Sequence, residues 1–110
     1  MGKESGVDLE VFAGICGFTT TIHAEAAPGY HAVLSLSTEC PNFKKVAKVL
    51  GTEPLNVMDE LFKKGESQVL AACNGNVPHV SCPVPAAILK ALEVSVGLAL
   101  PSDPKITFLS

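Results

Sequence analysis

The stretch that decides the fold is residues 18–37, FTTTIHAEAAPGYHAVLSLS. Its first nine residues alternate between two faces, with Thr20, Ile22, Ala24 and Ala26 on one side and Thr19, Thr21, His23 and Glu25 on the other. This period of two is typical of a half-buried strand. A Pro-Gly turn follows, and residues 30–37 are again rich in apolar residues. The stretch therefore predicts two antiparallel strands joined by a tight turn.

Similar patterns extend outward from this hairpin. Residues 7–15 alternate in the same way and predict a preceding strand. After the hairpin, Pro41 and Gly51 bracket one expected helix, residues 53–64 predict a second, and a third begins at Pro83 or Pro85 and runs to about Leu98. Two short segments are expected to be extended: residues 68–72, as a short strand or a lead-in, and residues 106–109, as an edge strand. We therefore predict an α+β fold, with a small antiparallel sheet of three to four strands and three helices packed on one face.

The composition indicates one domain spanning residues 1–110, with residues 1–6 frayed. Hydrophobic residues make up 47% of the chain and charged residues 17%, which is enough to bury a core without disulfides. The N-terminal residues show no signal peptide, so we expect a cytoplasmic protein. In a reducing compartment, the four cysteines are expected to be thiols or metal ligands.

The charge pattern bears on the partners. The net charge is -3, and all eight basic residues are lysines. Arginine supplies the bidentate fork for phosphates and guanines, so we expect no nucleic-acid partner. The chain is almost entirely apolar from Val84 to Leu100, but Lys90 and Glu93 interrupt the run, so we expect a core helix and no membrane span. Because this helix needs cover on nearly every side, we also expect a homodimer that pairs through it.

The four cysteines are the candidate site. Cys16 follows the first expected strand, Cys40 follows the third, and Cys73 and Cys82 flank a loop. In an antiparallel meander, the ends of the first and third strands lie at the same edge of the sheet. We therefore expect all four thiols, with His79 as a further ligand, to bind a metal at this edge.

The spacing of these cysteines favours an iron–sulfur cluster over zinc. Structural zinc sites normally use paired CxxC knuckles, and this chain has none. Iron–sulfur clusters accept dispersed thiolates, and the Cys-Pro pairs at Cys40 and Cys82 resemble part of a bacterial cluster signature. The first hypothesis is thus a small intracellular metal-binding protein used for electron transfer or sensing. Its redox partner is left unspecified.

Two alternatives remain open. In the first, Cys73 and Cys82 form a redox-active thiol pair. In the second, the chain is a homodimeric interaction module whose cysteines are inert packing residues. No phosphate-binding loop appears, and the adjacent carboxylates of Asp59 and Glu60 point different ways on a helix. The sequence leaves open whether the chain is an enzyme.

Overall fold

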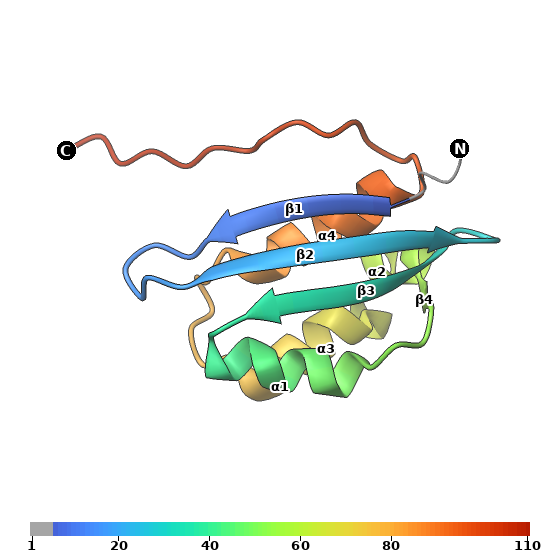
Figure 1. Cartoon of the computed structure of the whole chain (residues 1–110), viewed down its shortest axis with the longest axis horizontal. Helices are drawn as coiled ribbons and strands as arrows, with labels where there is room; N and C mark the ends of the chain where they lie inside the picture. Colours follow the sequence, from blue (N-terminus) through green and yellow to red (C-terminus); the bar gives the residue numbers. More distant parts are fainter. Residues whose placement is uncertain (1–5) are drawn as a thin grey trace.

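The computed structural model describes residues 6–110 and shows a sheet with helices on one face (Figure 1). The sheet contains β1 (Gly6–Phe12), β2 (Thr19–Ala27), β3 (His31–Thr38) and the two-residue β4 (Leu55–Asn56). The strands lie in sequence order, and each antiparallel pair is formed by neighbours in the chain. The predicted α+β class and antiparallel sheet are confirmed.

The side chains of β2 alternate between a buried and an open face of the sheet, as predicted. Thr20, Ile22 and Ala24 are buried beneath the helices, whereas His23 lies on the open face. The β2–β3 turn places Gly29 and Tyr30 in the left-handed region, at φ 78° and 57°. Glycine adopts this conformation freely, but a tyrosine there is strained.

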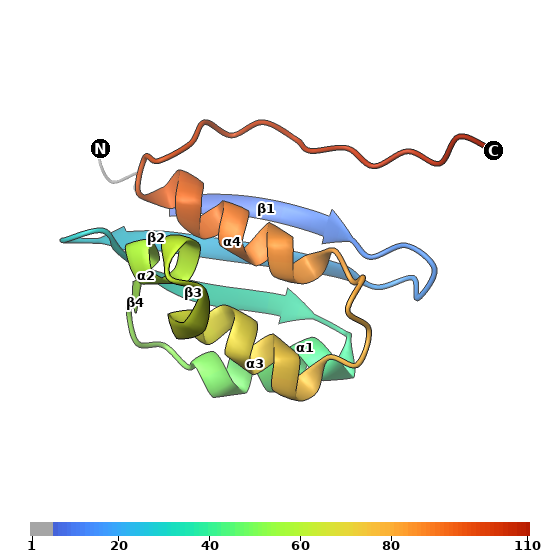
Figure 2. The ribbon, with the colours of Figure 1, turned by 180° about the vertical axis from the view of Figure 1, so that it is seen from behind.

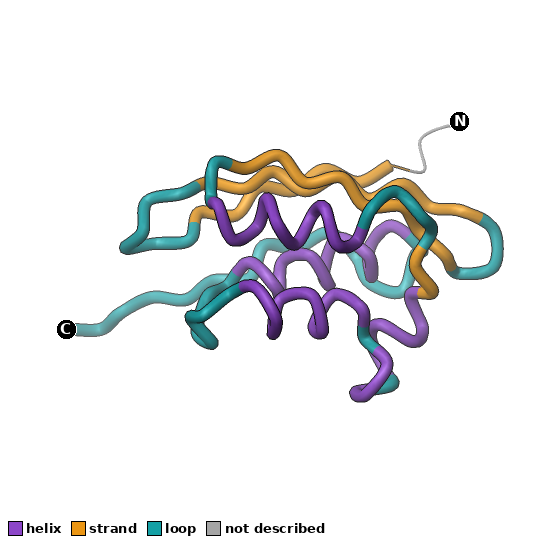
Figure 3. Tube along the Cα trace, turned by 90° about the horizontal axis from the view of Figure 1, so that it is seen from below, coloured by secondary structure: helices purple, strands orange, loops and turns teal. Residues whose placement is uncertain are grey.

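Four α-helices and one short 3₁₀ helix follow the first three strands. They are α1 (Pro41–Leu50), α2 (Val57–Phe62), the 3₁₀ helix η1 (Lys64–Glu66), α3 (Gln68–Asn76) and α4 (Val84–Ser95). Figures 2 and 3 show them packed on a single face of the sheet. In the part of the chain that is described, no helix combines the length and the apolar character needed to span a bilayer.

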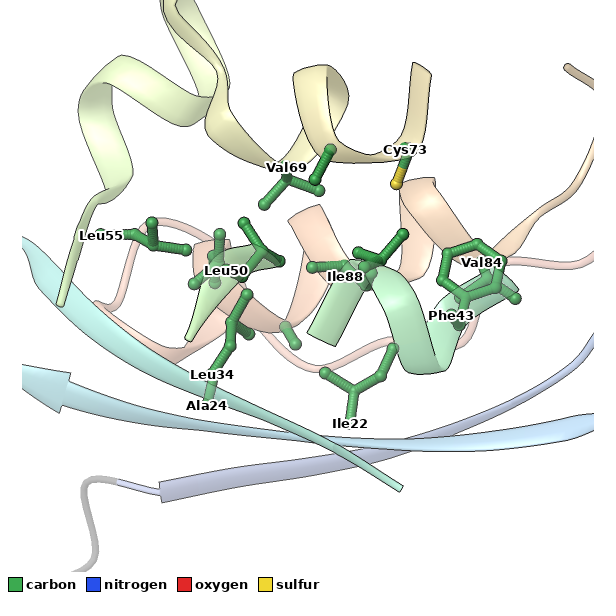
Figure 4. Close-up of a cluster of buried hydrophobic side chains, with 14 of the residues drawn as sticks. Ile22, Ala24, Leu34, Phe43, Leu50, Leu55, Val69, Cys73, Val84 and Ile88 are labelled. Carbon is green, nitrogen blue, oxygen red and sulfur yellow. The ribbon is translucent and has the colours of Figure 1, made fainter. Parts of the chain in front are cut away.

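The buried cluster joins the sheet to the helices (Figure 4). Ile22 of β2, Phe43 of α1 and Ile88 of α4 are essentially inaccessible to solvent. Burying a side chain of this size contributes about 2 kcal/mol to folding. The core is therefore densest under β2 and β3, where the helices cover the sheet.

Several local predictions were wrong. Residues 68–72 belong to α3 rather than to a strand, and the expected helix over residues 53–64 is divided into β4, α2 and η1. Residues 106–109 form no strand. Gly6, expected to be frayed, begins β1, and the rest of the frayed segment, residues 1–5, lies outside the described residues.

A buried carboxylate accounts for the position of α3. Glu60 of α2 is 3% exposed, and its Oε1 accepts hydrogen bonds of 2.9 Å from the Ser67 hydroxyl and the Val69 amide. Its Oε2 accepts another, also of 2.9 Å, from the Gln68 amide. The Ser67 hydroxyl is the N-cap of α3 and accepts from the Leu70 amide at 3.0 Å. Amides that begin a helix lack partners within it, so a negative charge here stabilises α3.

Candidate functional site

The four cysteines come from four connected segments of the fold. Cys16 lies in the β1–β2 loop, Cys40 is the N-cap residue of α1, Cys73 lies on α3, and Cys82 precedes α4. The thiols of Cys16 and Cys40 raise the pKa of Cys82, and Cys82 in turn raises that of Cys73. These charge contributions are smaller than the effect of burial on both thiols.

The chemical state of Cys73 and Cys82 is set mainly by burial. Desolvation, with a contribution from Cys82, raises the pKa of the Cys73 thiol to about 11. Burial also raises the pKa of Cys82, while the Val84 amide at the start of α4 opposes the shift. The start of α4 favours a thiolate at Cys82, but desolvation is the larger effect. Both groups are neutral thiols near pH 7 and hence weak nucleophiles and weak ligands.

The predicted metal site is wrong. Among residues 6–110, no group of three or more His, Cys, Asp or Glu side chains could hold a metal ion. The physical reason is a difference in burial: Cys40 and Cys73 belong to the apolar core, whereas Cys16 is exposed and Cys82 is only half-buried. Figure 4 shows Cys73 within the core cluster that also contains Phe43 and Val84. Neither the iron–sulfur cluster nor zinc at Cys16, Cys40, Cys73 and Cys82 is supported.

The redox alternative and the role of His79 are corrected as well. All four cysteines are free, and no cysteine pair, Cys73 and Cys82 included, is close enough to form a disulfide. The His79 side chain is exposed. The backbone carbonyl of His79 accepts a hydrogen bond from the Cys82 amide at 3.1 Å. His79 therefore helps to shape the turn before α4, and it joins no metal-binding group.

A histidine between two carboxylates lies on the open face of the sheet. His23 Nδ1 is 2.7 Å from Asp8 Oδ1, and His23 Nε2 is 3.0 Å from Glu25 Oε1. These hydrogen bonds, with that to Asp8 contributing most, raise the pKa of His23 above its usual value. Because both ring nitrogens are engaged, neither is available as a general base. The arrangement is a cross-strand ion pair that joins β1 to β2.

Two surface hollows lack the side chains that catalysis or metal binding usually needs. One of about 380 Å³ is lined by residues of the β2–β3 turn and the end of α4: Ala26, Ala27, Gly29, Tyr30, Ser95 and Val96. A second, of about 220 Å³, lies between β3 and the end of α1. Neither is lined by a cysteine, histidine, carboxylate or lysine. Neither of these two hollows presents an assembled catalytic centre.

The least expected feature is the segment after α4. Every residue from Leu100 to Ser110 is exposed, and residues 101–110 have no regular secondary structure. Figures 1 and 2 show this segment as an extended arm on the β1 side of the molecule. Ile106, Phe108 and Leu109 are 84%, 96% and 92% exposed. The sequence predicted a strand here, and the structure places the apolar side chains in solvent.

The fold and these surfaces define a two-layer α+β protein with scattered free cysteines and an exposed apolar C-terminal arm. The chain belongs to the Family of unknown function (DUF6951), which it matches over residues 7–108. The match includes most of the exposed arm, so the arm is part of the family's shared region. No curated protein and no solved structure matches the chain.

Proposed function

We propose that this chain is an interaction module that assembles with a second copy of itself. The observation that carries the proposal is the uncovered apolar surface after α4. Five large apolar side chains are exposed within residues 98–109: Leu98, Leu100, Ile106, Phe108 and Leu109. Isolated exposed apolar residues are normal on a monomer, but a concentration of this kind marks an interface.

The α4 helix supports the same proposal. Its inner stripe is buried against the sheet, while Leu89, Val94 and Val96 are only half-buried at its flanks and C-terminal end. A stable interface covers about 800 Å² on each partner. The arm and the end of α4 lie next to each other in the chain, so together they could supply such an area. The sequence predicted pairing through residues 84–100, and the proposed surface extends that region to residue 109.

The cysteines enter this proposal as packing residues. Cys40 and Cys73 fill the core, and the raised pKa of Cys73 and of Cys82 keeps these thiols protonated and unreactive. Four free thiols suit a reducing compartment, so the cytoplasm remains the proposed location. One hydrophobic cluster contains residues of β2, β3, β4 and all four α-helices among the described residues, and Leu9 and Val11 of β1 pack against it, which supports a single domain.

Sedimentation velocity on the full chain tests the proposal. The account predicts a species of twice 11.4 kDa that dissociates on dilution from about 100 µM to about 1 µM. The variant with all four cysteines replaced by alanine or serine is the control, and it should assemble as the parent chain does. A species of 11.4 kDa at every concentration would overturn the proposal.

A further inference from the structure

The edge of the sheet at β1 is open to another strand. Among residues 6–110, β1 pairs with β2 and with no other strand. At seven residues, β1 is a long edge strand with one row of backbone amides and carbonyls facing outward. Such an edge is a template for an added strand, which would supply the missing hydrogen bonds.

The apolar layer is also incomplete at this edge. Val7, Leu9 and Val11 of β1 point toward the helices but remain half-exposed, whereas Ile22 of β2 is fully buried. The difference arises because α4 packs against both β1 and β2 (Figure 2), while no strand lies beside the free edge of β1 among the described residues. A strand beside β1 with apolar side chains on its inner face would complete this layer.

The C-terminal arm has the matching pattern. Ile106 and Phe108 are two residues apart, so an extended arm places them on one face. Lys105, Thr107 and Leu109 then lie on the other face. If Ile106 and Phe108 continue the inner layer, Lys105 falls on the outer face.

The face of β1 that points away from the helices carries negative charge, opposite to the positive charge of Lys105. Asp8 and Glu10 are exposed there, on the face that Lys105 would share. This pairing of faces is the same for a parallel and an antiparallel arm, because it depends only on the alternation of side chains. The apolar side chains of Ile106 and Phe108 and the charge of Lys105 therefore favour the same orientation of the arm beside β1.

We propose that residues 105–109 of one chain add as a strand to the β1 edge of a second copy, and that the two copies exchange arms reciprocally. This inference rests on the proposed self-association and assigns it a surface. In the structure, the arm stands clear of its own sheet, with its apolar side chains in solvent. Ten extended residues reach about 35 Å, so residues 101–110 can cross to a second body.

The arm turns back after α4 and runs on the β1 side of its own molecule without pairing with the described strands of the sheet (Figures 1 and 2). Pro101 and Pro104 restrict the backbone between α4 and the apolar residues and favour extended conformations. A reciprocal exchange about a two-fold axis covers both open edges with one repeated contact. Docking of the arm on its own β1 is the competing arrangement, and it would produce a monomer.

The test measures dimer dissociation of the full chain by sedimentation. The double variant Ile106→Glu with Phe108→Glu should raise the dimer Kd by about 100-fold, because it places two charges in the apolar layer. Phe62→Glu and Ile15→Glu are the matched controls, since Phe62 and Ile15 are also exposed apolar residues but belong neither to the arm nor to β1. Both controls should leave the Kd unchanged.

A charge exchange tests the orientation of the arm. Lys105→Glu should weaken the dimer, and combining it with Glu10→Lys should restore most of the loss. Failure of the second change to restore binding would overturn the assigned pairing of faces.

The outcomes separate this inference from the proposed function. If the chain dimerises and the double variant dimerises equally well, the module self-associates through another surface and the arm exchange is wrong. If the parent chain is monomeric at every concentration, both proposals are wrong. Loss of the dimer in Phe62→Glu or Ile15→Glu, with no effect of the double variant, would also overturn the exchange.

Discussion

The carboxylate of Glu60 on α2 accepts a hydrogen bond of 2.9 Å from the hydroxyl of Ser67, the N-cap residue of α3. Both side chains are buried, and the same carboxylate also receives two backbone amides of α3. This contact holds the two helices at a fixed separation. It is the main buried polar interaction among the described residues.

Replacement of this carboxylate should destabilise the protein. Glu60→Gln keeps the size of the side chain but puts an NH₂ group where a carboxylate oxygen accepted hydrogen bonds. We expect the free energy of unfolding to fall by about 3 kcal/mol, measured by urea denaturation. Asp59→Asn is the control, because Asp59 forms only a surface pair with Lys63 and should change stability by less than about 1 kcal/mol. Equal losses in the two variants would contradict this account of α3.

Tyr30 provides a test of backbone strain. Its φ of 57° favours glycine, and its side chain is 53% exposed. Tyr30→Ala removes the side chain and keeps the strain, whereas Tyr30→Gly removes both. We expect the glycine variant to be more stable than the alanine variant by about 1 kcal/mol in thermal or urea unfolding. An alanine variant that equals or exceeds the glycine variant would show that the turn is unstrained.

The pair of His23 with Asp8 predicts a dependence of stability on pH. The pKa of His23 is raised in the folded state, so protonated His23 favours folding. This contribution is complete below the unfolded pKa of about 6.5 and is lost as the pH rises through the higher folded pKa. The parent chain should therefore exceed His23→Gln in urea midpoint by more at about pH 5.5 than at about pH 8.5. The same difference at both pH values would exclude the linkage.

The cysteines should differ in reactivity with a thiol reagent. At about pH 7.5, exposed Cys16 should be modified first, while Cys73, buried and with a pKa of about 11, should react only after denaturation. The rapid phase should disappear in Cys16→Ser and persist in Cys73→Ser. The opposite pattern would show that the core around Cys73 is open.

The sequence was sufficient to predict β2, β3 and α1. The alternation over residues 18–26 corresponds to β2 within one residue, and Pro41 and Gly51 correctly bracket α1. These signals are local, because they depend on residues close together in the chain. The fold class followed from the same patterns.

The position of α3 required a distant contact. Asn74, Gly75 and Asn76 are poor helix formers, so the local sequence gives little sign of a helix here. The stabilising carboxylate comes from Glu60, on a different helix. The local signal for α3 was Ser67, a residue type that commonly caps the start of a helix.

The candidate site shows a similar limit. Chain order predicted that the four cysteines would lie at connections between elements, but it did not give the direction or depth of each thiol. Burial of Cys40 and Cys73 in the core separates them chemically from exposed Cys16. Residues 106–109 were predicted to be an edge strand, whereas their lack of a strand partner could not be read from local sequence.

Amide hydrogen exchange over residues 105–109, followed as a function of protein concentration, tests the central claim most directly. In the isolated chain these amides are exposed, and in the exchanged dimer they pair with β1 of the other copy. The account predicts slow exchange at high concentration and fast exchange after dilution below the dimer Kd. Unprotected exchange at all concentrations, or protection that does not change on dilution, would contradict it.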